Sequence, residues 1–64
     1  MKNQTRLRKE SIILSAIEIM DELGIQKLSM RELANKEGVT DGALYRHFKS
    51  KDDILLGVLD YYSQ

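Results

Sequence analysis

The sequence contains no cysteine and no proline among its 64 residues. Without cysteine, the chain has no disulfide, no thiolate ligand for a metal and no cysteine nucleophile. A chain of this length has room for one domain with a small core, and no second module fits. It is too small to enclose a substrate pocket, and its sequence shows neither a nucleophile paired with a base nor a glycine-rich phosphate loop. An enzyme is therefore not expected.

A long hydrophobic run is also missing. The first eleven residues are polar and basic, and the apolar stretch that follows is interrupted by Glu18, Asp21 and Glu22. Neither a signal peptide nor a membrane-spanning helix is expected, so the default location is the cytoplasm. No cofactor or metal is expected, because His47 is the single histidine and no second ligand lies at metal-binding spacing from it.

The chain has no net charge, because ten basic residues balance ten acidic ones. The two signs are nevertheless separated along the sequence. Residues 1–9 and 42–51 contain basic side chains and no acid, while most acidic residues lie in 10–22 and 52–60. Such segregation can give a neutral molecule a basic face for a polyanion, although solvated charges without a partner produce the same pattern.

The sequence is rich in helical periodicity. Apolar residues recur at helical spacing up to Leu23 and are followed by Gly24, which predicts an amphipathic helix at about residues 6–23. A stripe of this kind is expected to be plain core. Its members are Ile13, Ala16, Ile17, Met20 and Leu23.

Three further helices are marked by their N-terminal caps. Ser29, with Glu32 at capping-box spacing, predicts a helix over 30–37 that ends at Gly38. Thr40 predicts a short helix over 41–48, and Ser50 a fourth over 51–63. The second and third helices are flanked by apolar pairs at staple spacing, Leu28 with Leu33 and Val39 with Leu44. The fourth is expected to bury Ile54, Leu55, Val58, Leu59 and Tyr62. No strand signal and no repeat is found, so the predicted fold is an all-α domain of four helices.

The second and third of these helices have the form of a helix-turn-helix. Ala34 supplies a small residue where the two helices cross, and Gly38 supplies the tight turn between them. A helical hairpin in an unrelated bundle would give the same pattern. The outward face of the third helix distinguishes a DNA-binding helix-turn-helix from such a hairpin.

That outward face suits the major groove of DNA. If Leu44 and Phe48 point inward, a rotation of about 100° per residue turns Gly42 and Arg46 outward. A helix in the major groove meets base edges at its floor and phosphates on two walls. Gly42 permits close approach, and Arg46 has the geometry to bind guanine O6 and N7.

The neighbouring residues complete this interpretation. Ala43 lies beside the outward strip and can touch a thymine methyl group, while Tyr45 and His47 on the two flanks are candidates for phosphate contacts. Tyr45 has the alternative of packing partly into the core with its hydroxyl in water. Asp41 can accept from cytosine N4 or interact favourably with the helix N-terminus, and the second role is preferred.

The stretch SMRELANKEGVTDGALYRHFKSKDDIL, with an upstream helix that ends in LG, resembles the N-terminal DNA-binding domain of the TetR family of bacterial transcriptional regulators. The resemblance covers about residues 8–60. It implies a regulator, in the first place a ligand-released repressor, whose partner is double-stranded DNA with a palindromic operator. It also implies a homodimeric parent with a ligand-binding and dimerisation domain that is absent here. The fourth helix would then be truncated. The isolated chain is expected to be monomeric, because the packing of four short helices uses all of its apolar residues.

Residue by residue, the resemblance implies backbone contacts to DNA from Ser29, Arg31, Thr40, Tyr45, His47 and Lys51. It places Asp41, Gly42, Ala43 and Arg46 toward the bases. Asp41 departs from the small, basic or amide residues of the family at that position. The N-terminal arm, with Arg6 and Arg8, resembles arms that reach toward phosphate or the minor groove.

The alternative hypothesis is a helical protein-interaction module, in which the exposed residues Tyr45, Tyr61 and Tyr62 contact a protein partner. The two hypotheses differ in the salt dependence of binding to a DNA fragment, because only phosphate neutralisation makes affinity fall steeply with salt.

Overall fold

A computed structural model describes residues 9–63 of the chain. Its elements are α1 (Lys9–Leu23), the 3-10 helix η1 (Ile25–Lys27), α2 (Met30–Glu37), α3 (Asp41–Tyr45) and α4 (Lys51–Ser63). No strand occurs between residues 9 and 63, so the predicted all-α fold with four α-helices is confirmed. None of the described helices is long and apolar enough to cross a membrane.

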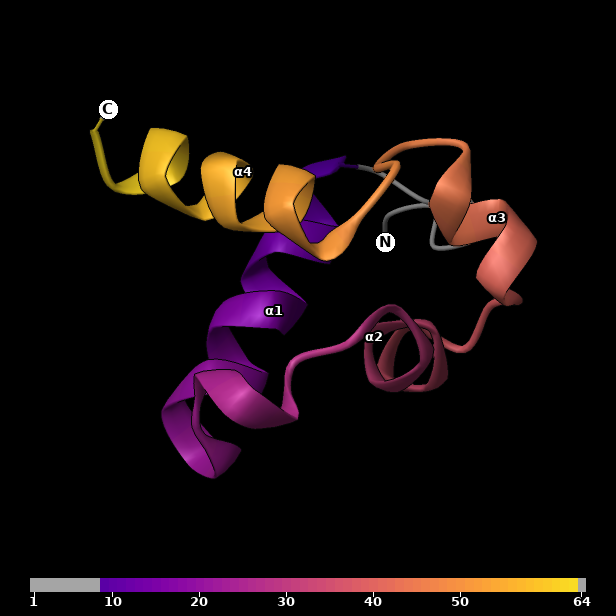
Figure 1. Cartoon of the computed structure of the whole chain (residues 1–64), viewed down its shortest axis with the longest axis horizontal. Coiled ribbons are helices and arrows are strands. Elements are labelled where there is room, and N and C mark those ends of the chain that lie inside the picture. The colour runs from indigo at the N-terminus through magenta and orange to yellow at the C-terminus, as the bar shows by residue number, and fades with distance from the viewer. Residues whose placement is uncertain (1–8, 64) are drawn as a thin grey trace, which may run out of the picture.

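α1 is the central helix of the fold. It packs against η1, α2 and α4, whereas α3 packs mainly against α2. In Figure 1, α2 lies between α1 and α3, and α4 crosses α1 and runs on until it ends far from α3. Because α3 has one main helical neighbour, most of its circumference is left open.

A single apolar core holds these helices together. It includes the two residues of the predicted staple, Leu28 and Leu33, and the predicted inward pair, Leu44 and Phe48. No polar or charged residue is buried within residues 9–63. The buried residues are Ile12, Ile13, Ala16, Ile19, Leu28, Met30, Leu33, Ala34, Leu44, Phe48, Ile54 and Val58.

The predicted core stripe of the first helix is wrong at its C-terminal end. Leu23 is 57% exposed, while Ile12 and Ile19, which were not expected in the stripe, are buried. α1 packs against both α2 and α4, so its buried face is broader than one stripe. Leu23 is the last residue of α1, and Gly24 then turns the chain with a φ of 92°. The expected start of this helix, at residues 6–8, lies outside the described residues.

The prediction for the fourth helix is wrong in the same way. Ile54 and Val58 are buried, but Leu59 and Tyr62 are 64% and 65% exposed. Leu59 and Tyr62 lie on the side of α4 that is turned away from the core, whereas Tyr61, between them in sequence, is half-buried and packs against it. Leu56 is also exposed, which leaves an apolar face on this helix.

Hydroxyl side chains set the starts of α2 and α3. Ser29 Oγ accepts a hydrogen bond from the Glu32 backbone N–H at 3.0 Å, and Thr40 Oγ1 accepts one from the Ala43 backbone N–H at 3.1 Å. The return bond from Glu32 to the Ser29 backbone, which the predicted capping box includes, is not formed within residues 9–63. An exposed Glu loses side-chain entropy when it is held in one geometry, which opposes this second bond.

A related pair of bonds is found at α4, where the acid accepts from the residue before the cap rather than from the cap itself. Ser50 Oγ accepts from the Asp53 backbone N–H at 3.4 Å, and Asp53 Oδ2 accepts from the Lys49 backbone N–H at 3.0 Å. The Ser-x-x-Asp spacing of residues 50 and 53 was a signal for this, in addition to the favourable charge of Asp53 in the first turn.

The predicted recognition helix over 41–48 is three residues too long. α3 ends at Tyr45, after which the Arg46 and His47 backbone N–H groups donate to carbonyls three residues back, at 3.3 and 2.9 Å. Bonds of this spacing tighten a last helical turn. Arg46 keeps right-handed helical angles, with φ −70° and ψ −24°, so the segment continues as a helical turn.

A polar clamp joins α2 to α1. The Ser11 hydroxyl donates to Glu37 Oε1 at 3.1 Å, and the Ser15 hydroxyl donates to Glu37 Oε2. Glu37 is the last residue of α2, where the helix dipole disfavours a carboxylate, so these donors offset an unfavourable position. Beside them, Lys36 Nζ lies 3.0 Å from Glu18 Oε1, and this hydrogen-bonded ion pair raises the pKa of Lys36 above its ordinary value. The clamp fixes the orientation of α2, and therefore of the turn at its end.

Candidate nucleic-acid interface

The outer face of α3 and of the turn after it gathers six of the predicted site residues. Leu44 is fully buried and Phe48 is nearly so, which orients the helix as the sequence predicts. Four of the six residues are exposed and two are half-buried. The exposed residues are Asp41, Gly42, Tyr45 and Arg46, and the half-buried residues are Ala43 and His47.

Gly42 has no structural requirement to be glycine. Its φ is not positive, and a Cβ at this position would find only Thr40 Oγ1, at 4.0 Å. Within a helix, glycine costs about 0.5–1 kcal/mol relative to alanine. Neither backbone strain nor packing within the described residues accounts for this cost.

The capping hydroxyls of α2 and α3 keep a donor free. Ser29 and Thr40 each use an oxygen lone pair to accept a backbone N–H, which leaves the hydroxyl hydrogen available. Thr40 is exposed and Ser29 is half-buried. Each hydroxyl can therefore cap its helix and donate to a phosphate oxygen at the same time. Arg31, the second residue of α2, is exposed and adds a charged donor at the same helix start.

Lys51, the first residue of α4, is half-buried. Just before it stand Lys49, which is exposed, and the capping residue Ser50. The sequence interpretation assigned neither of these two to the interface, although both lie in the basic stretch 42–51.

A third basic residue reaches this region through the tertiary fold. The Lys9 ammonium group lies 5.7 Å from the centroid of the Phe48 ring, which brings the first described residue of α1 next to the segment after α3. No spacing in the sequence could have indicated this contact. Arg6 and Arg8, the predicted arm residues, lie outside the described residues.

Asp41 has more than one role open to it, and for His47 the structure bears on metal binding. Asp41 is exposed at the first position of α3, where a negative charge is favoured by the helix dipole and where a base edge can also be reached. His47 is half-buried, and within the part of the chain that the structure describes no group of three His, Asp or Glu residues gathers at metal-binding distance.

The three tyrosines of the alternative hypothesis do not share one surface. Tyr61 is half-buried rather than exposed, and its ring packs edge-on against Tyr62 with 5.8 Å between centroids. Tyr62 is at the distal end of α4, whereas Tyr45 is on α3 at the other end of the molecule (Figure 1).

The structure has two short helices joined by Gly38 in a left-handed conformation, and the second helix has an open face with small residues and an arginine. This arrangement is that of helix-turn-helix DNA-binding modules. The comparison with known families agrees with this class and narrows it. The chain belongs to the tetR family of bacterial regulatory proteins, whose family model matches residues 12–58. The resemblance found in the sequence is thereby confirmed, and the family is one of regulators rather than enzymes.

Individual relatives are similar over most of this chain. An uncharacterized HTH-type transcriptional regulator, YerO, of Bacillus subtilis (strain 168) is 38% identical over 86% of the chain. The class D tetracycline repressor protein of Escherichia coli is 44% identical over 78% of it. A fatty acid metabolism regulator protein of Bacillus subtilis (strain 168) is 36% identical over 86%. The chain spans 19%, 23% and 28% of the length of these three relatives, respectively.

Proposed function

We propose that this chain reads double-stranded DNA by inserting α3 into the major groove. The observation that carries the proposal is the open outer face of α3, where Gly42 leaves space and Arg46 projects outward without a partner in residues 9–63. Arg46 then binds guanine O6 and N7, and Ala43 touches a thymine methyl group. Asp41 lies nearest the start of this strip, where it reads a base or stabilises the helix.

The contacts to the DNA backbone come from the rim of this face. Tyr45 and His47 flank the base-reading strip, and the hydroxyls of Ser29 and Thr40 donate to phosphates while they cap their helices. Three cationic side chains of the described region add charge: Arg31, Lys51 and the unpredicted Lys49. In this proposal the arm residues Arg6 and Arg8, which lie outside the described residues, add further contacts to phosphate or the minor groove.

The regulatory proposal is a repressor that a small ligand releases from DNA. It is supported by relatives that are named tetracycline repressors, and by the greater length of those relatives. In this proposal the chain is the reading module of a longer homodimeric parent, which acts in the bacterial cytoplasm on a palindromic operator. A two-fold dimer places two recognition helices in successive major grooves, so operator symmetry mirrors protein symmetry.

Selection of bound duplexes from a random pool, with the dimeric parent as bait, tests the proposal directly. Two inverted half-sites about 34–36 Å apart, or a multiple-turn spacing, are the expected result. Enrichment without symmetry would refute the dimeric part. Binding that does not weaken as salt rises would refute DNA reading and favour the protein-interaction module.

A further inference from the structure

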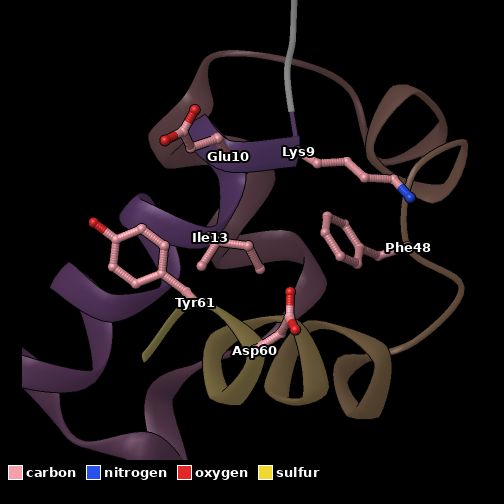
Figure 2. Close-up of a pocket in the computed structure, with 7 residues that line it drawn as sticks. Lys9, Glu10, Ile13, Phe48, Asp60 and Tyr61 are labelled. Atoms are coloured by element: carbon pink, nitrogen blue, oxygen red, sulfur yellow. The ribbon is translucent and has the colours of Figure 1, made fainter. Parts of the chain in front are cut away.

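Gly57 lies where three parts of the fold meet. A Cβ on this residue would lie 2.6 Å from Cδ1 and 3.4 Å from Cγ1 of Ile13 in α1, and 3.5 Å from Cε1 of Phe48. Figure 2 shows Ile13 and Phe48 facing the same space beside α4. Gly57 therefore leaves a notch in α4 that receives side chains from two other elements.

The reason for glycine at this position is steric. Gly24 and Gly38 have positive φ angles, and a Cβ added at either would have no neighbour within 4 Å, so they serve backbone geometry. Gly57 is in the middle of α4, where glycine costs about 0.5–1 kcal/mol relative to alanine. The close seating of Ile13 and Phe48 offsets this cost.

Phe48 is the anchor of the connection between α3 and α4. Within the described stretch 45–53 it is the single buried residue, between Leu44 and Ile54 in the core. It stands two residues after Arg46 and three before Lys51, so its position sets where both of these candidate contacts lie. A displacement of Phe48 would move them relative to α2.

We propose that Gly57 is a positioning residue for DNA binding: its notch seats Phe48 and thereby sets the spacing between Arg46, Lys51 and the start of α2. This inference rests on the proposed function. A pocket of about 500 Å³, lined in part by Ile13, Phe48 and Gly57, adjoins the notch. The terminal methyl of Ile13 can move into this space, so alanine at 57 displaces mainly Ile13, whereas a longer side chain reaches Phe48.

The test compares the wild-type chain with Gly57→Leu, which places a good helix former at the position, and with the volume-exchanging double variant Ile13→Ala/Gly57→Leu. Leu56→Ala, on the exposed face of the same helix, is the matched control. The affinity of each folded variant for a short mixed-sequence duplex is measured over a range of salt concentrations. The measured quantity is the slope of log K against log salt concentration, which counts phosphate contacts and does not follow stability.

Gly57→Leu is expected to lose about one unit of slope, the contribution of one phosphate contact. The double variant is expected to regain the wild-type slope, and Leu56→Ala to keep it. A wild-type slope in Gly57→Leu, or no recovery in the double variant, would overturn the inference. Wild-type protein that shows no salt-dependent binding would instead refute the proposed function.

A second measurement covers the case in which Gly57→Leu does not fold. Backbone amide NMR shifts of the smaller Gly57→Val, whose side chain extends beyond Cβ, are expected, without DNA, to change at Phe48 and in the connection 46–51 more than at the start of α2. Unchanged shifts in the connection would overturn the positioning role independently of any DNA.

Discussion

At the scale of single residues, the outer face of α3 combines a residue without a side chain and a long cationic one. Gly42 and Arg46 are one helical turn apart, both exposed, and neither contributes to the core. Substitutions at these positions therefore separate DNA binding from folding more cleanly than substitutions at Leu44 or Phe48, which are buried.

Arg46→Ala is expected to weaken binding to a selected site by about 1–3 kcal/mol and to relax the preference at one base position, because a bidentate guanine contact is lost. Affinities for the selected site and for random DNA provide the measurement. Equal losses on both would assign Arg46 to a phosphate. Lys49→Ala, at a proposed backbone contact in the same exposed segment, is the comparison and is expected to lose affinity equally on both.

Gly42→Ala is expected to stabilise the fold by about 0.5–1 kcal/mol, because alanine is the better helix former and its Cβ meets no close neighbour. DNA binding is expected to weaken at the same time, because the added methyl group stands between α3 and the groove. Urea unfolding and a DNA titration measure the two effects. Unchanged affinity would show that no surface approaches Gly42 closely.

Lys51→Ala is expected to weaken binding to all sequences alike and to lower the salt slope by about one unit, through loss of one phosphate contact. Lys27→Ala, in the exposed η1 between α1 and α2, is the control for a cation of the same kind away from α3. An unchanged slope in Lys51→Ala would remove this residue from the interface.

At the scale of elements, the start of α2 depends on one hydroxyl group. The hydrogen bond from the Glu32 backbone to Ser29 Oγ is present, and its reciprocal partner is not formed within residues 9–63. Ser29→Ala is therefore expected to destabilise the fold by about 0.5–2 kcal/mol, measured by urea or thermal unfolding. Glu32→Ala should cost less, since its side chain returns no cap bond. Equal stability of wild type and Ser29→Ala would mean that the cap contributes nothing to α2.

At the scale of the whole molecule, the isolated chain is still expected to be a monomer, but for a different reason from the one that the sequence suggested. That expectation assumed that four helices use all the apolar residues, whereas Leu56, Leu59 and Tyr62 are 63–65% exposed on α4. Three side chains on each of two chains nevertheless expose less than the total of about 1,200 Å² that a stable interface buries from both partners together.

Sedimentation of the isolated chain at micromolar concentration is therefore expected to show a monomer. A stable dimer would mean that the exposed face of α4 associates, and Leu59→Asp should then return the monomer.

A monomer reaches one half-site, so its affinity should lie nearer the non-specific range of roughly 10⁻⁴ to 10⁻⁶ M than that of a dimer. Fusion to an unrelated dimeric helix is expected to restore tight binding where the linker lets both halves engage. If the fused dimer bound no better than the single chain on a two-half-site duplex, the proposed symmetric reading would be wrong.

Local chemistry in the sequence determined where the helices begin and which side of α3 faces inward. Ser29, Thr40 and Ser50 each offer a hydroxyl to a backbone N–H three residues on, a bond that depends only on nearby residues. The outward direction of Arg46 follows from helical periodicity once Leu44 is placed in the core. The motif around them also identified the family.

The tertiary structure alone decided how far each apolar face is covered. Leu23 and Leu59 have the right spacing for burial, yet both are exposed, because burial requires a neighbouring helix and helical periodicity does not state which part of an apolar face that neighbour covers. The notch at Gly57 is likewise invisible in the sequence, since Ile13 and Phe48 come from distant positions. Contacts between residues far apart in the chain depend on how the helices pack. Spacing along the sequence indicates only the interactions between residues that are close in the chain.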